Sequence, residues 1–128
     1  MKKFFKYYFP VVVWMGVIFF LSSMEGNGQS READFWFYAE RKGAHVFEYF
    51  VLTLLFLRAF NSHKMTIREK IMSALIFPLA YSMTDEIHQQ FVAGRDGKLL
   101  DVGIDFFGIV LAVVVWNLWM KHRMRVER

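Results

Sequence analysis

Histidines and carboxylates occur in this sequence as pairs with helical spacing, in three separate segments. Side chains three or four residues apart lie on the same face of a helix. The pairs are His45 with Glu48, Asp85 with His88, Asp85 with Gln89, and Asp101 with Asp105. Groups of this kind transfer protons, bind cations or form buried ion networks.

Acids outnumber nearby bases in these segments, and this excess favours a bound cation. A nitrogen and oxygen shell for a divalent metal ion is predicted from His45, Glu48, Asp85 and His88. No fixed metal motif such as HExxH is present. A second prediction is general acid–base chemistry by Asp85, Glu86 and His88. The alternative is a network of hydrogen bonds that joins helices without any chemistry.

Four apolar blocks carry these residues, at about 7–23, 44–60, 71–91 and 102–120. A membrane-spanning helix needs about 20 residues, with a range of about 17–25. The sequence therefore predicts an all-α polytopic membrane protein, a small bundle of four transmembrane helices forming one domain over 1–128. A signal peptide is an alternative for the first block, but no small-x-small cleavage site follows it. A soluble helical bundle is disfavoured, because 106–116 is apolar on every face.

Composition excludes several other classes of protein. The chain has no cysteine, so disulfides, thiol catalysis and thiolate metal sites are ruled out. The net charge of +4 could indicate nucleic-acid binding, but the basic residues lie at the ends of apolar blocks. This placement instead predicts a lipid bilayer as the partner and no nucleic acid.

The positive-inside rule gives a topology for the four blocks. Most lysines and arginines lie before the first block, between the second and third, and after the fourth. Both termini and the middle link are therefore predicted to be cytoplasmic, and the protein is expected in the plasma membrane. The paired histidines and carboxylates then all lie at the outer ends of their helices. Charges at matching depth on three helices are expected to face one another rather than lipid.

The link from Met24 to Gly43 contains an aromatic run, Phe35 to Tyr38, between charged residues. One prediction is a short amphipathic helix at the membrane surface, with Arg31, Glu32 and Glu40 in water. An irregular aromatic loop at the lipid headgroups is the alternative.

The combined pattern resembles the VanZ-like family of bacterial membrane proteins. The resemblance rests on Lys42-x-x-His45-x-x-Glu48-Tyr49, Thr84-Asp85-Glu86-x-His88-Gln89-x-Phe91, Arg95, Asp101-x-x-x-Asp105-x-x-Gly108, and the Phe20–Ser23 run FLSS. Ala93 stands before Gly94 where the family pattern has Pro, and this difference is expected to affect loop rigidity rather than chemistry.

The resemblance implies a cell-envelope protein of the teicoplanin-resistance type, without naming a reaction. The first functional hypothesis is an outer-leaflet site that binds or modifies a lipid-linked cell-wall precursor or a lipoglycopeptide, with Arg95 and Lys42 holding a phosphate or carboxylate. The predicted binding residues are Lys42, His45, Glu48, Tyr49, Gln89, Arg95, Asp101 and Asp105. The second hypothesis is a non-enzymatic partner subunit whose polar cluster is a structural ion network.

Overall fold

The computed structural model of the chain describes residues 1–24, 35–95 and 97–127, without the side chains of Phe37 and Tyr38. It consists of helices, with no strand among the described residues, which confirms the all-α class. The helices are α1 (Lys2–Tyr7), α2 (Phe9–Ser23), α3 (Phe35–Phe60), α4 (Ile67–Gln89) and α5 (Leu99–Val126).

Each predicted block corresponds to a helix, but three helices begin before their apolar run. Thr66 is the reason for the early start of α4. Its hydroxyl accepts from the backbone N–H of Glu69, and the Glu69 carboxylate accepts from the Thr66 backbone N–H at 2.7 Å. This reciprocal capping box satisfies two donors of the first turn. α5 runs through the basic tail to Val126, where charged residues support a helix as well as apolar ones do.

The prediction of four membrane spans is supported only in part. By length and composition, Ala39–Phe60 within α3 and Leu99–Val126 are long and apolar enough to cross a membrane. α2 has 15 residues, which is short for a span, although α1 precedes it with a break only at Tyr8. α4 has 23 residues, but its last turns carry Asp85, Glu86 and His88, which lower its mean hydropathy.

The predicted surface helix in the link 24–43 falls partly on residues 25–34, which lie outside the described part of the chain. Phe35 and Trp36 form the first turn of α3, and each is 73% exposed. From Phe35 onward the aromatic run therefore belongs to the long helix itself.

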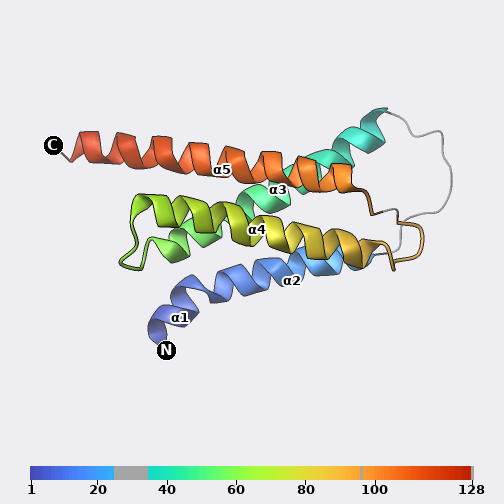
Figure 1. Ribbon diagram of the computed structural model, residues 1–128, viewed down its shortest axis with the longest axis horizontal. Helices are drawn as coiled ribbons and strands as arrows, with labels where there is room; N and C mark the ends of the chain where they lie inside the picture. Colours follow the sequence, from blue (N-terminus) through green and yellow to red (C-terminus); the bar gives the residue numbers. More distant parts are fainter. Residues whose placement is uncertain (25–34, 96, 128) are drawn as a thin grey trace.

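The helices pack side by side, and α3 crosses behind the others in the view of Figure 1. α3 contacts every other helix, and α5 contacts α3 and α4. The N-terminus, the α3–α4 loop and the C-terminus lie at one end of the molecule (Figure 1). The last turns of α2 and α4 and the first turns of α3 and α5 lie at the other end.

Small residues let α3 and α5 approach closely. A Cβ added to Gly108 of α5 would overlap the backbone carbonyl of Val46 in α3. Ala112, one turn further along α5, is also fully buried. Small side chains at helix contacts are typical of membrane bundles, where backbone packing replaces the hydrophobic effect between helices.

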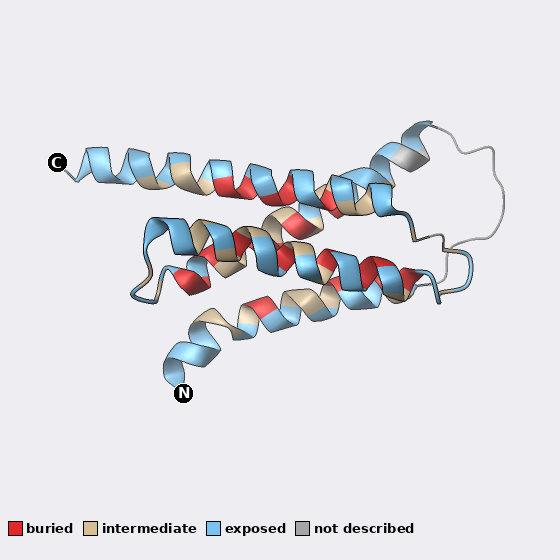
Figure 2. Ribbon diagram, viewed as in Figure 1, coloured by how far each residue is buried: buried red, intermediate tan, exposed pale blue. Residues whose placement is uncertain are grey.

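Buried residues lie where the helices face one another, and exposed residues cover the outside of the bundle (Figure 2). The interior holds polar as well as apolar side chains. Polar side chains lie inside, among them Thr53, Ser82, Asp85 and Asp105, each at most 4% exposed. Large apolar side chains cover the outside along the middle of the helices, for example Phe77 of α4, which is 53% exposed. Contiguous exposed apolar surface of this kind marks contact with lipid or protein. The pattern therefore indicates a bundle whose surroundings are apolar.

Replacing Gly108 with Ala should destabilise the bundle by about 1–3 kcal/mol, because the added methyl group forces α3 and α5 apart. Gly103→Ala is the matched control, since nothing lies within 4 Å of a Cβ at Gly103. The measurement is the free energy of unfolding by SDS titration in mixed micelles, followed by circular dichroism. Equal effects of the two substitutions would contradict the close packing at Gly108.

Candidate functional site

Hydrogen bonds join polar side chains of four helices toward the end of the bundle opposite the termini. α2 contributes Ser22, α3 contributes His45 and Glu48, α4 contributes its last turns, and α5 contributes Asp105. The sequence predicted this gathering from three helices, and the structure adds α2 as a fourth.

Asp105 is the centre of the first group of contacts and is 1% exposed. Its Oδ1 lies 2.9 Å from Nδ1 of His45, and its Oδ2 accepts from the hydroxyl of Ser82 at 2.5 Å. Each carboxylate oxygen therefore has a donor from a different helix. A carboxylate on one ring nitrogen fixes the orientation of an imidazole and leaves the other nitrogen for a ligand or a proton.

Asp85 is the centre of the second group. Its Oδ1 accepts from the hydroxyl of Ser22 at 2.6 Å, and its Oδ2 accepts from Nε2 of Gln89 at 3.2 Å. The same Gln89 nitrogen also donates to Ser22 Oγ at 2.9 Å. Ser22, Asp85 and Gln89 thus form a closed triangle that joins the end of α2 to α4. Its members are all buried, so each polar atom needs these partners.

The α4–α5 loop is tied to both neighbouring helices. Arg95 donates from Nε to the carbonyl oxygen of Met24 at 3.1 Å and from Nη2 to that of Leu21 at 2.9 Å. These are carbonyls at the C-terminal end of α2, where a cation also complements the helix dipole. Oε1 of Glu86 accepts from the backbone N–H of Lys98. Gly94 turns the loop with a φ of 72°, a region that favours glycine.

A cavity of about 330 Å³ opens beside these contacts. Its polar lining consists of Ser22, Arg41, His45, Glu48, Gln89 and Arg95. Arg41 and Arg95 line the same cavity, and partial burial, followed by the positive charge of Arg41, lowers the pKa of Arg95. No carboxylate forms an ion pair with either arginine among the described residues. The cavity therefore presents two arginines beside one histidine and one glutamate.

The residues predicted for a metal do not form one centre. Nowhere in 1–24, 35–95 and 97–127 are three or more His, Asp or Glu side chains grouped so that they could hold a metal ion. Within the predicted set, His45 faces Asp105, and Asp85 faces Ser22 and Gln89. The His88 ring packs on Phe19, with centroids 4.4 Å apart. The structure thus divides the predicted metal set among separate contacts.

The predicted catalytic residues lie away from the cavity wall. Asp85, Glu86 and His88 do not line it, whereas His45 and Glu48 do. Lys42 is exposed and Arg41 takes the cavity position, one residue away on the same helix. Asp101 lies in the first turn of α5, where a carboxylate complements the helix dipole. Its predicted partner, Asp105, lies deeper in the bundle.

Several buried atoms at this end have no hydrogen-bond partner in the described part of the chain. They are the Tyr49 hydroxyl, Oε2 of Glu86, Nδ1 of His88 and Oε1 of Gln89. Gln89 also lines the cavity. Buried polar atoms are normally paired, so these groups are able to accept or donate bonds to water or to a polar ligand.

Ser82 and Arg41 could hardly be predicted as functional residues from the sequence. Ser82 lies three residues before Asp85 and seven before Gln89, so it shares their helix face, but an isolated serine in an apolar block is common. Arg41 and Lys42 are adjacent cations at the start of an apolar block, and only the rotation of α3 decides which one enters the cavity. Ser22 was recognised only as part of the FLSS run.

Comparison with known proteins gives one match. A family model described as VanZ/LLP1 matches residues 7–120, which is most of the chain. No curated protein and no solved structure matches the chain. The match spans all four apolar blocks and every residue of the cavity described above.

A double-mutant cycle on His45 and Asp105 should give a coupling energy of about 1–3 kcal/mol, because each replacement by Ala removes the same buried contact. His45→Ala should be costly when Asp105 is present and much less costly beside Asp105→Ala. Unfolding in mixed micelles measures all four proteins. A parallel cycle with His122, which is exposed in the C-terminal part of α5, should be additive. Additivity of the His45 cycle would disprove the contact.

Proposed function

Because this chain belongs to the VanZ/LLP1 family, we propose that it is an envelope membrane protein whose cavity binds the anionic headgroup of a lipid-linked or lipoglycopeptide molecule. The family and the two long apolar helices together indicate a membrane protein. The proposed link to resistance against glycopeptides such as teicoplanin comes from the family.

The single observation that carries the proposal is the pair Arg41 and Arg95 in one cavity. Like charges repel, so two guanidiniums in one cavity that form no ion pair with a carboxylate of the described residues favour an anion between them. Arginine binds phosphate and carboxylate with paired hydrogen bonds, which fits a diphosphate link or a peptide carboxylate. Arg95 keeps donors beyond the two that it uses on α2.

If the bound molecule is modified, His45 or Glu48 in the cavity could act as the base. Asp105 orients His45, and the other nitrogen of that ring makes no hydrogen bond within the described residues. The Glu48 carboxylate lines the same cavity. Either group could accept a proton from a hydroxyl or a water at the bound headgroup. Asp105 would then act as a positioning residue and not as the base itself.

The contacts of Asp85 favour a second, structural function for part of the predicted cluster. Ser22 and Gln89 satisfy this carboxylate inside the protein, so it is not available to a ligand. In the partner-subunit alternative, every carboxylate of the predicted cluster would be bonded within the protein, as Asp85 is, and none would contact a ligand. The lining of the cavity by Arg41, Glu48 and Arg95 argues for binding instead.

The proposed topology has both termini and the α3–α4 loop in the cytoplasm and the cavity at the outer leaflet. The distribution of lysine and arginine supports it. An outer position suits a molecule that carries its lipid in the outer leaflet and its polar part outside the cell.

Single cysteines should report this topology, since the natural chain has none. Ala93 and Lys64 are both exposed and lie in the loops at opposite ends of the bundle. The Ala93→Cys variant should react with a membrane-impermeant maleimide in intact cells. The Lys64→Cys variant should react only after the cells are permeabilised. The reverse result would invert the topology and place the cavity in the cytoplasmic leaflet.

Arg41→Gln should weaken binding of a polyprenyl diphosphate or of teicoplanin to the purified protein about tenfold, the loss of one charge-assisted hydrogen bond. Fluorescence titration in detergent measures the affinity, and teicoplanin susceptibility of cells expressing each variant gives the second readout. Arg68→Gln is the control, because Arg68 is exposed at the opposite end. Failure of both probes to bind the natural protein would refute the proposal.

A further inference from the structure

We infer that a second site, at the end of the bundle opposite the cavity, binds one anionic phospholipid, with its phosphate at Arg58 and Arg123 and one acyl chain between α3 and α5. This site uses none of the residues of the cavity described above.

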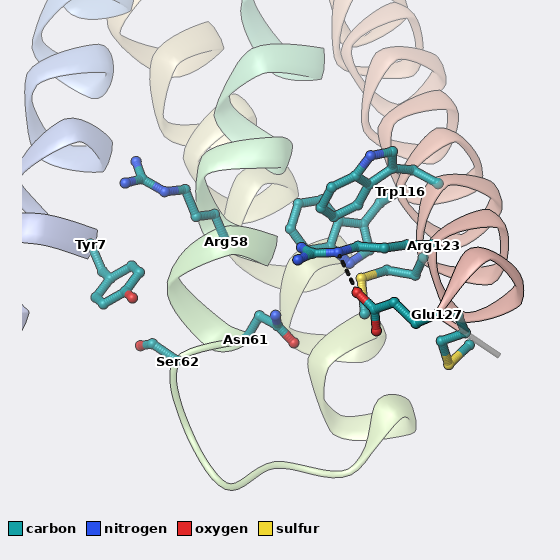
Figure 3. A pocket seen from close by; sticks show the side chains of 10 residues that line it. Tyr7, Arg58, Asn61, Ser62, Trp116, Arg123 and Glu127 are labelled. Carbon is teal, nitrogen blue, oxygen red and sulfur yellow. Dashed lines mark hydrogen bonds and ion pairs between the residues drawn. The ribbon is translucent and has the colours of Figure 1, made fainter.

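The headgroup part is a polar pocket of about 480 Å³ (Figure 3). It lies between Tyr7 of α1, the end of α3 with Arg58 and Asn61, and the last turns of α5 with Trp119 and Arg123. Guanidinium, amide and hydroxyl groups can all donate hydrogen bonds to a phosphate. The lining is therefore suited to an anionic oxygen-rich group.

The charges of this pocket are arranged on aromatic surfaces. The Arg58 guanidinium lies 5.6 Å from the ring centroid of Tyr7, and that of Arg123 lies 5.6 Å from the ring of Trp119. These contacts hold the cations without neutralising them. Nε of Arg123 pairs with Glu127 at 3.2 Å, as the dashed line in Figure 3 marks. No carboxylate of the described residues pairs with Arg58. The pocket thus contains two guanidiniums and one carboxylate, which leaves positive charge for a ligand.

An apolar groove of about 390 Å³ continues from this pocket along α3 and α5. The two share Arg58, Trp116 and Trp119, and the rest of the groove is aliphatic, lined by Val51, Leu54, Leu55 and Val115. The groove begins at two tryptophans and an arginine and continues along aliphatic side chains. A phospholipid has the same sequence of groups, with its phosphate at the membrane interface and its acyl chain in the hydrocarbon region.

The polar pocket is continuous with the apolar groove, and this continuity favours a lipid over a free phosphate as the ligand. A free phosphate would use only the polar pocket and leave the groove unexplained. Arg125 and Lys121, in the same last turns of α5, add positive charge that attracts an anionic membrane surface. Under the proposed topology this is the cytoplasmic leaflet, but the binding itself does not depend on that orientation.

Native mass spectrometry of the detergent-solubilised protein tests the site with dioleoylphosphatidylglycerol and dioleoylphosphatidylcholine as probes. The first molecule of phosphatidylglycerol to bind should do so about tenfold more tightly than phosphatidylcholine. Phosphatidylglycerol carries a net negative charge, whereas phosphatidylcholine is neutral overall. Inorganic phosphate at the same concentration should not displace it, since it lacks the chain. Equal binding of the two lipids by the natural protein, or displacement by phosphate alone, would overturn the inference without recourse to any variant.

Paired variants with the same change of charge localise the site. Arg58→Gln with Arg123→Gln should remove the preference for phosphatidylglycerol. Lys64→Gln with Arg68→Gln should retain it, because these exposed cations do not line the pocket. Circular dichroism verifies the helix content of both proteins. Equal loss of preference in the two double variants would mean attraction to general surface charge and would disprove a built site. Binding at the cavity, tested with Arg41→Gln, is independent of either outcome.

Discussion

The bundle depends on satisfying two buried carboxylates in apolar surroundings. Asp85 and Asp105 each receive two hydrogen bonds, from side chains on α2, α3 and α4. An unpaired carboxylate at such a position would be very costly, so the helices must adopt the one arrangement in which the donors meet the acids. The tight approach of α3 to α5 at Gly108 and the fastening of α2 by Arg95 both serve this arrangement.

Much of the fold follows from elementary rules. Apolar blocks of sufficient length predicted the helices, and the shared depth of His45, Asp85 and Asp105 predicted that they would face the bundle interior rather than lipid. Spacing along one helix could not show which side chain pairs with which, because pairing depends on helix rotation. For this reason the metal set was predicted as one group, whereas His45 turns to Asp105 and His88 to Phe19. The hydrogen bond of Ser82 could not be predicted for the same reason, because the partner of a serine depends on helix rotation.

The two ends of the molecule present different chemistry built from similar parts. At one end, Arg41 and Arg95 lie beside a histidine and a glutamate in a cavity formed largely by polar side chains. At the other, Arg58 and Arg123 rest on aromatic rings and adjoin an aliphatic groove. Arginine suits both settings because its planar group hydrogen-bonds anions and also stacks on aromatic faces.

The order of the residues in these networks has a consequence for synthesis of the chain. Ser22 precedes Asp85, and both His45 and Ser82 precede Asp105, so the donors from other helices are always made first. Asp85 and Asp105 each emerge from the ribosome when their donors from other helices are already present. The early helices carry no carboxylate that needs a later helix as its donor in these networks. Asp85 and Asp105 can therefore enter the bundle in the direction of translation with these donors already in place.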